Sequence, residues 1–422
     1  MNSKTEKRER FLVIFIIISL FFENVRLFSL FGGVIKVSHV AMILAILYGL
    51  IYCKPSRKTF LYFFFFMCIP LLPISRINNI NGFLGSYMNY AIIVFFVCFA
   101  LKFLKEAFCK NVSFYLKCFN VVVSVASVLA IIQFMMMNFF GIFWLDGLWG
   151  SMQFHPSSYG IEMGFYRAYS VFHEPSYLGF VCNASIAINL ASPDSMYKST
   201  TNKYAYVILY IIATVCTVST AALLIMGIVL LSFLCTIRIK RNFMLVLLIV
   251  LAIFLCGLLI AVMADIDIPM LNMLYERLFN ETDRVGTSAY ERLKTPIEYI
   301  KKTFEYYPFF GRGLGQEGRV DAVGIIGRFK GIHNSVYGII VTFGITSVFY
   351  YWWFIHSFFS AKFKNRNLSG RLLLFFATIG MYMSTGSFVS GDTFILTTII
   401  FLIMSSFTID IINENNIESA KK

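Results

Sequence analysis

The segment YRAYSVFHEPSYLGF combines a cation, a hydroxyl, an imidazole and a carboxylate over a short stretch, in Arg167, Ser170, His173 and Glu174. An arginine can bind a phosphate group through two hydrogen bonds, and a carboxylate or an imidazole can act as a general base. Glu174 also has a simpler interpretation, because an acid followed by Pro175 is typical of the first turn of a helix. The sequence leaves both interpretations of Glu174 open.

Three more candidates lie further along the chain, at Arg292, Arg312 and His333. Arg292 falls in a stretch with helical spacing, where a solvated polar face is the simple interpretation. Arg312 stands between glycines in GRGLG, where the backbone can approach an anion closely and the guanidinium can bind phosphate. His333 precedes an apolar run, so it is either a polar helix cap or a proton-transfer group that titrates near neutral pH.

These residue types together suit a substrate with a lipid tail, an anionic phosphate linker and a polar head. The arginines would bind a pyrophosphate and stabilise it as it leaves, while a base would deprotonate an incoming hydroxyl. The sequence contains no Walker A, G-x-G-x-x-G or H-E-x-x-H motif, and none of its nine cysteines falls in 141–174 or 265–333. We therefore expect neither a cofactor nor a metal.

The elements that must position these residues are apolar. The chain is 58% hydrophobic and 14% charged, whereas a soluble domain carries about 25% charged residues. Apolar runs long enough to cross a bilayer recur along the chain, and a tight hairpin is expected at 204–237, broken near Ser219 and Thr220. The sequence predicts an all-α polytopic membrane protein with about twelve spans, at 11–33, 37–53, 59–75, 86–101, 116–140, 175–192, 204–219, 220–237, 243–264, 334–359, 372–388 and 392–411.

Charge predicts the orientation of these spans. The net charge of +14 comes from basic patches between apolar runs, which are typical of topology signals and not of a nucleic-acid-binding stripe. Examples are 54–58, 238–242 and 362–366. By the positive-inside rule these patches are cytoplasmic, so both termini of this multi-pass membrane protein are expected inside.

The whole chain, 1–422, is expected to form a single integral membrane domain with two sizeable loops on the non-cytoplasmic side, 141–174 and 265–333. Because a long structureless loop is uncommon, we expect the second loop to be folded and functional. The spacing of apolar residues over 290–307 predicts an amphipathic helix at the membrane surface. Pro308 then ends this helix, and GRGLG follows as a turn.

Four segments carry a resemblance to a known family: RAYSVFHEPSYLG, SAYERLKTPIEYIKKTFEYYPFFGRGLGQ, HNSVYGIIVTFGITS and TVSTAALLIMGIVLL. These segments resemble motifs of the bacterial O-antigen polymerase and ligase superfamily of membrane glycosyltransferases. In the same order, the motifs are an arginine followed by EPS, the outer-loop pattern, a His-Asn helix start with a glycine break, and a serine-containing span. The chain most resembles the Wzy-type O-antigen polymerases. Thr220 stands where the ligase branch often carries an arginine.

The resemblance implies a GT-C-like helical fold and a metal-independent transfer between undecaprenyl pyrophosphate-linked oligosaccharides, as in lipopolysaccharide and other polysaccharide biosynthesis. It implies that Arg167, Arg292 and Arg312 bind the pyrophosphate, with Arg292 also serving catalysis. Either His333 or Glu174 would be the base. A flippase and a chain-length regulator of the same pathway would be the protein partners.

Three alternatives belong to other classes. A ligase would transfer finished glycan to lipid A-core, but the EPS segment and the missing arginine favour the polymerase. A lipid-linked oligosaccharide flippase would have short loops and charges within its helices, whereas here the polar residues lie in long outer loops. A structural scaffold would leave the cluster of arginine, glutamate and histidine unexplained.

Overall fold

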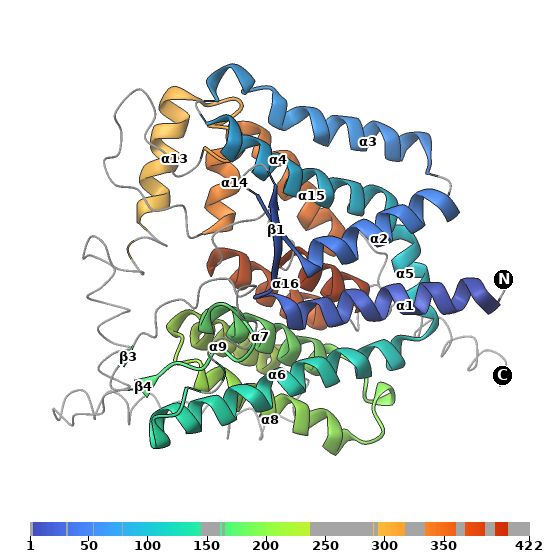
Figure 1. The fold of residues 1–422 in the computed structure, drawn as a ribbon, viewed down its shortest axis with the longest axis vertical. Coiled ribbons are helices and arrows are strands. Elements are labelled where there is room, and N and C mark those ends of the chain that lie inside the picture. The colour runs from blue at the N-terminus through green and yellow to red at the C-terminus, as the bar shows by residue number, and fades with distance from the viewer. Residues whose placement is uncertain are drawn as a thin grey trace.

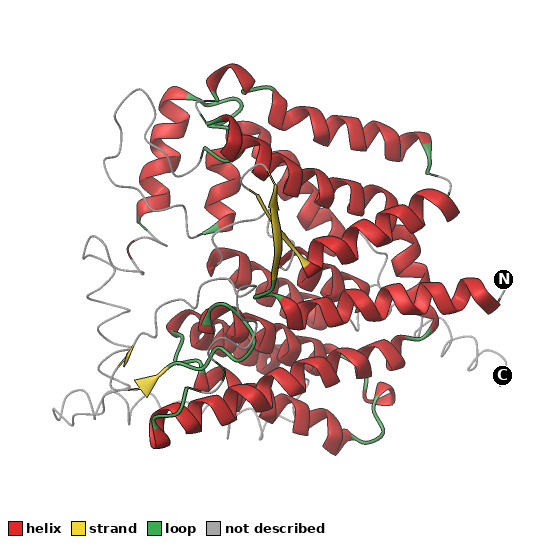
Figure 2. Ribbon diagram, viewed as in Figure 1, coloured by secondary structure: helices red, strands yellow, loops and turns green. Residues whose placement is uncertain are grey.

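The computed structural model of the chain is mostly helical, and the helices run side by side in two groups (Figure 1). The strands among the described residues are short and form two separate pairs (Figure 2). The structure describes residues 3–30, 33–53, 55–77, 79–143, 145, 161–162, 165–236, 290, 294–316, 334–359, 368–384 and 393–403.

The first group of helices is built around α7 (Pro175–Ala191), in which every residue from Pro175 to Leu190 is buried. This helix packs against α8, α9 and α16, so it forms the centre of the largest apolar core. The other helices of this group are α1 (Ser3–Ser19), α2 (Val37–Tyr52), α5 (Leu101–Lys110), α6 (Val112–Phe140), α8 (Thr200–Cys216), α9 (Thr220–Thr236), α16 (Leu368–Ser384) and Thr393–Ile403.

The second group has its own smaller core, centred on Phe83, Tyr90 and Phe343. Its helices are α3 (Arg57–Cys68), α4 (Ile80–Phe95), α13 (Thr295–Tyr306), α14 (Ser335–Phe343) and α15 (Ser347–Phe359). A π-helical turn over Phe96–Ala100 continues α4 into α5 and so joins the two groups. The candidate residues are therefore shared between two packed units of one bundle.

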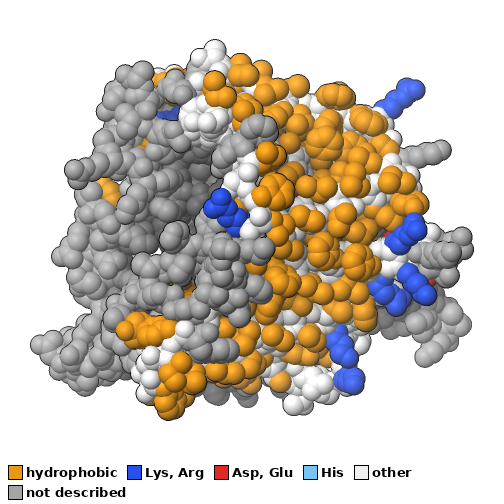
Figure 3. Space-filling view, viewed as in Figure 1, with side chains coloured by type: hydrophobic (Ala, Val, Ile, Leu, Met, Phe, Trp, Pro, Cys, Tyr) orange, Lys and Arg blue, Asp and Glu red, His pale blue; other side chains and the backbone are white. Residues whose placement is uncertain are grey.

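The surface of the bundle is apolar over a broad area. Figure 3 shows hydrophobic side chains over most of the coloured part of the visible face, with most of its Lys and Arg at the edge where α1 begins. No residue of α3 is buried, and Phe64 is 60% exposed. Because water does not favour so much exposed apolar surface, this face is suited to lipid. Two helical stretches among the described residues are long and apolar enough to cross a membrane, Val112–Phe140 and Ser335–His356.

Several expected elements are present where the sequence places them. Helices cover the expected spans 37–53, 116–140 and 175–192 closely. The break expected near Ser219 and Thr220 is confirmed, because α8 ends at Cys216 and α9 begins at Thr220. The glycine break in the span 334–359 is confirmed at Gly344, which has φ of 58°.

The expected span 11–33 is wrong in its second half. Helix α1 ends at Ser19, a short 3-10 turn follows, and the chain then forms a hairpin of β1 (Arg26–Leu30) and β2 (Gly33–Lys36). Glu23 separates the turn from the hairpin and is ion-paired to distant residues, which fixes the chain away from the helical path.

The expected span 86–101 also differs, since helical structure runs from Ile80 to Lys110. The expected span 243–264 lies outside the described residues, as does most of the loop 265–333. The number of twelve spans and the GT-C-like arrangement stay predictions.

Helix ends in this bundle follow local capping chemistry. The side chain of Ser199 accepts a hydrogen bond from Asn202 N–H and begins α8. Asn334 accepts from Tyr337 N–H in the same way and begins α14. Helix α6 ends at Gly141, whose φ of 66° is in the left-handed region that glycine adopts easily. We call the end of the bundle where α6 finishes and α7 begins the loop end.

Candidate functional site

The segment 167–174 lies at the loop end, is buried over Ala168–Phe172, and is held there by α6. Gln133 on α6 accepts hydrogen bonds through Oε1 from the backbone N–H groups of Tyr169 (2.9 Å) and Ser170 (2.7 Å). The Ser170 hydroxyl donates to the carbonyl of Ala126 at 2.7 Å, and Ser170 has a positive φ of 56°. These buried bonds fix the backbone that carries the candidate side chains.

Arg167 is anchored at the break between α8 and α9. Its Nε–H donates to the carbonyl of Thr217 at 3.2 Å, and the following N–H, of Ala168, donates to Cys216 at 3.1 Å. Carbonyls at the end of α8 have no partner within the helix, so they are natural acceptors for an arginine. The structure thereby brings the arginine-containing segment next to the TVST segment, as two of the four resemblance segments.

Glu174 is the N-cap residue of α7, and Pro175 occupies the first turn. The Ser176 hydroxyl donates to Glu174 Oε2 at 2.9 Å. The helix-start interpretation of Glu174 is therefore confirmed. Its carboxylate is nevertheless 45% exposed, so this negative charge also stands at the surface of the loop end.

A buried ion cluster next to Glu174 contains two residues that the sequence analysis did not single out, Glu23 and Lys36. The carboxylate of Glu23 is 1% exposed and lies 2.7 Å from Lys36 Nζ and 2.6 Å from His173 Nδ1. It also accepts the His173 backbone N–H at 3.0 Å. The cluster ties the β1–β2 hairpin to the start of α7.

Charge pairing shifts the pKa values of this cluster in opposite directions. Burial alone would raise the pKa of Glu23, but His173 and Lys36 outweigh that effect and hold it far below its usual value. Burial alone would lower the pKa of His173, but the neighbouring Glu23 carboxylate raises it above the usual value. A sequence signal for Glu23 existed, because an acid inside a predicted membrane span is a functional-site candidate.

Arg312 lies in the smaller group of helices, in a glycine-rich turn packed on α14. Its N–H donates to the carbonyl of Val341 at 2.9 Å, and the next N–H, of Gly313, donates to Thr342 at 3.0 Å. The side chain is only 5% exposed, and its guanidinium stands 5.2 Å from the centre of the Tyr299 ring. Burial raises the pKa of Tyr299, so the ring is a neutral partner for the cation.

The glycines around Arg312 are needed for this close packing. Gly311 and Gly315 have φ of 63° and 69°, and a Cβ at either would approach a backbone oxygen at 2.4 Å or less. The turn expected at GRGLG is thus confirmed as a tight contact with α14 and α4. The expected helix over 290–307 is confirmed as α13 over Thr295–Tyr306, with Tyr307 just after it.

Arg292 and His333 lie outside the described residues. The capping function at the start of α14 is performed by Asn334, the residue after His333. The roles expected for Arg292 and His333 stay predictions.

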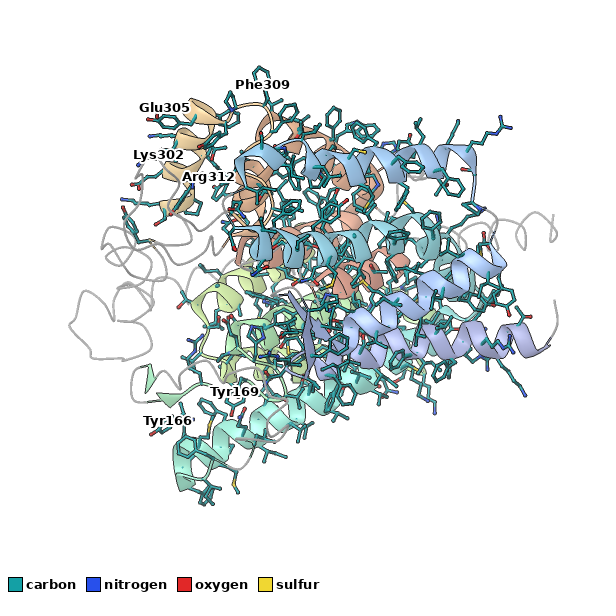
Figure 4. The ribbon with its side chains drawn as sticks, turned by 45° about the horizontal axis from the view of Figure 1, so that its top comes forward. Tyr166, Tyr169, Lys302, Glu305, Phe309 and Arg312 are labelled. Atoms are coloured by element: carbon teal, nitrogen blue, oxygen red, sulfur yellow. The ribbon has the colours of Figure 1, made fainter. Side chains whose placement is uncertain are left out.

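The described candidates share one end of the molecule. Figure 4 shows Arg312 on the side away from the start of α1, with Tyr166 and Tyr169, the neighbours of Arg167, on that same side. Lys302 and Glu305 of α13 also lie there. Arg312 and the residues next to Arg167 in the chain therefore lie at the same end of the molecule, and a shared site for all the candidates stays a prediction. Among these residues no cluster of His, Cys, Asp or Glu is suited to hold a metal ion.

A bundle of helices with a broad apolar outer face defines a class, the helical membrane proteins. A family comparison specifies the class further. The chain belongs to the family described as WcaD colanic acid polymerase, whose match covers residues 12–406. No curated protein matched the chain. Membership of this family indicates that the protein polymerises polysaccharide repeat units.

Proposed function

We propose that the protein joins undecaprenyl pyrophosphate-linked oligosaccharide repeat units into a surface polysaccharide on the periplasmic face of the bacterial inner membrane. The observation that carries this proposal is the rigid loop 167–174, which holds Arg167 and Glu174 at the same end of the bundle as Arg312. Membership of a polysaccharide polymerase family supports the same reaction.

In the proposed reaction the reducing end of a growing chain leaves its lipid pyrophosphate. The chain is transferred to a hydroxyl at the non-reducing end of an incoming lipid-linked unit. Arg167, Arg292 and Arg312 bind the pyrophosphate and stabilise its charge as it leaves. Glu174 and His333 are the proton acceptors that the sequence suggests. The family description favours a polymer such as colanic acid, and O-antigen is the second polymer that the resemblance supports.

A ligase that transfers finished glycan to lipid A-core is the alternative reaction, and a flippase is the alternative without chemistry. The family match to a polymerase favours neither of them. Both make distinct predictions for a deletion strain, so one experiment separates the three.

The test deletes the gene in its host and restores it as wild type or as Arg167→Ala, Arg292→Ala, Glu174→Ala or His333→Ala. Lys301→Ala is the matched control, because Lys301 is an exposed cation on α13. We expect the deletion to leave single repeat units without polymer. Loss of one arginine that stabilises the leaving charge should slow polymer formation about 10²–10³-fold, with normal amounts of the variant in the membrane.

Three results would contradict the proposal. Accumulation of lipid-linked polymer that is never attached to its acceptor would identify a ligase. Repeat units trapped on the cytoplasmic face would identify a flippase. An unchanged glycan pattern in the deletion strain would remove the protein from polysaccharide synthesis altogether.

A further inference from the structure

The buried Glu23 carboxylate has both oxygens engaged by donors from two other segments. Oε1 accepts from Lys36 Nζ at 2.7 Å and lies 2.6 Å from His173 Nδ1, while Oε2 accepts the His173 backbone N–H at 3.0 Å. A carboxylate that is ion-paired with two cationic groups and accepts a backbone N–H is stable in its ionised form. It is therefore an acceptor only, and the proton between Glu23 and His173 belongs to Nδ1.

This arrangement determines which nitrogen of His173 titrates. With Nδ1 protonated and ion-paired to Glu23 at 2.6 Å, proton exchange takes place at Nε2. Nε2 lies 3.9 Å from Glu174 Oε1, and the His173 side chain is 25% exposed. A hydroxyl oxygen can approach Nε2 to about 2.8 Å and form a hydrogen bond.

We propose that His173 is the catalytic residue that takes the proton from the acceptor sugar hydroxyl, and that Glu23 is the positioning residue that fixes its tautomer. This inference rests on the proposed polymerase function. It deepens that function by assigning the base to a residue other than Glu174 and His333. A buried carboxylate on Nδ1 that orients an imidazole for chemistry at Nε2 is a recurrent arrangement in general-base catalysis.

The step balances with the groups at hand. The acceptor hydroxyl gives its proton to His173 Nε2, and its oxygen forms a new bond to C1 of the donor sugar. The bond from C1 to the pyrophosphate oxygen breaks, and the pyrophosphate leaves with the electron pair. The imidazolium is stabilised by Glu23 and by the neighbouring Glu174 until Nε2 returns its proton to solvent.

The charged groups around His173 predict a pH dependence with a definite sign. Glu23 and Glu174 raise the pKa of His173, whereas Lys36 lowers it. The ring of Tyr177 also contacts the His173 ring, with the two centroids 5.7 Å apart. The reaction needs Nε2 unprotonated, so its rate falls as pH falls through this pKa. Removing the negative charge of Glu23 moves that acid limb to lower pH, and removing Lys36 moves it to higher pH.

The test uses the full-length protein purified in lipid nanodiscs and lipid-linked repeat units extracted from the deletion strain. Initial rates of lipid pyrophosphate release are measured over about pH 5–9, the range in which histidine titrates. The variants are His173→Asn, Glu23→Gln and Lys36→Met. Asparagine keeps a donor near the position of Nδ1 and removes Nε2, so its bond to Glu23 can persist.

The matched control is Lys110→Met, which breaks a different Lys–Glu pair, between Lys110 Nζ and Glu9 Oε2 at 3.0 Å. This pair lies at the end of the bundle that the positive-inside rule assigns to the cytoplasm. We expect His173→Asn to lower kcat about 10²–10⁴-fold with little change in KM, as for loss of a general base. Glu23→Gln and Lys36→Met should shift the acid limb in opposite directions, and Lys110→Met should leave both rate and pH profile unchanged.

Two results would overturn the inference while leaving the proposed function intact. One is a His173→Asn variant whose kcat stays within a few-fold of wild type. The other is an acid limb that neither Glu23→Gln nor Lys36→Met moves, which would assign the titration to another group. Wild-type protein that releases no lipid pyrophosphate from these substrates would instead contradict the proposed function itself.

Discussion

Arg167 shows how a single side chain can be both a structural anchor and a ligand for an anion. Its Nε–H is directed at the carbonyl of Thr217, which orients the plane of the guanidinium at the break between α8 and α9. A planar group with several donors can bind a pyrophosphate through paired hydrogen bonds, which a lysine ammonium cannot reproduce. The shape of the side chain should therefore matter as much as its charge.

We predict that Arg167→Lys retains less than about a tenth of the wild-type kcat/KM, and that Arg167→Ala is lower still, about 10²–10³-fold below wild type. The measurement is lipid pyrophosphate release by purified protein, with Lys301→Ala as the control. Full activity in Arg167→Lys would mean that a point charge is sufficient. Full activity in Arg167→Ala would remove Arg167 from the site.

Residue types predicted part of this site and could not predict the rest. Arg167 and Glu174 were evident because their segment concentrates charge next to an apolar run. The partnership of Glu23 with His173 was not, because it joins positions 150 residues apart in the chain. Such a pair forms only when the helices between the two residues have packed, and this packing cannot be predicted from the residue types of a single sequence.

At the scale of elements, the GRGLG segment depends on backbone proximity more than on side chains. Gly315 has φ of 69°, and a Cβ there would approach Gly82 O at 2.2 Å, so any larger residue must displace the segment from α4. The adjacent Gln316, which bonds to the backbone of Asn79 at 3.0 Å and 3.3 Å, would move with it. Arg312 lies in the same short segment and would lose its position over Tyr299.

We predict that Gly315→Ala destabilises the protein by about 1–3 kcal/mol, the usual cost of a strained backbone position, and lowers polymerisation. The matched control is Gly227→Ala, because Gly227 lies on α9 with open space around it. Alanine should stabilise that helix by up to about 1 kcal/mol. Thermal unfolding in detergent measures both. A Gly315→Ala variant as stable as wild type would show that α4 and the segment can separate without cost.

The same scale explains which helices the sequence could locate. Helix α7 was predicted almost to the residue, because Pro175 marks its start and no charged residue interrupts the mainly apolar run that follows. The end of α1 was missed, because apolar residues continue beyond Ser19 into the β1–β2 hairpin. Hydropathy reports that a segment avoids water, but it does not distinguish a helix from a buried or lipid-facing hairpin.

At the scale of the whole molecule, each of the two groups of helices carries candidate residues from a different part of the chain. The larger group supplies Arg167, His173 and Glu174, and the smaller group supplies Arg312 and Tyr299. Their cores meet through the continuous helix of α4 and α5. The affinity for a substrate that is bound by arginines of both groups would therefore depend on the relative position of the two groups.

The orientation of the bundle in the membrane leads to the last prediction. Basic clusters at the start of α1 and α3 predict a cytoplasmic end, and α13 then lies on the periplasmic side. We replace Lys58 and Lys301 singly by cysteine, since each is exposed at one of these two positions. The parent for both variants has its native cysteines replaced by serine or alanine, because Cys68 is exposed.

A membrane-impermeant thiol reagent is applied to cells whose outer membrane has been permeabilised. It should label Lys301→Cys at once and Lys58→Cys only after the inner membrane is broken. Because an active site that uses exported lipid-linked units must face the periplasm, the reverse pattern would contradict both the orientation and the proposed reaction. Labelling of both positions while the inner membrane is intact would mean that α3 does not begin in the cytoplasm. The positive-inside assignment of the basic clusters would then be wrong.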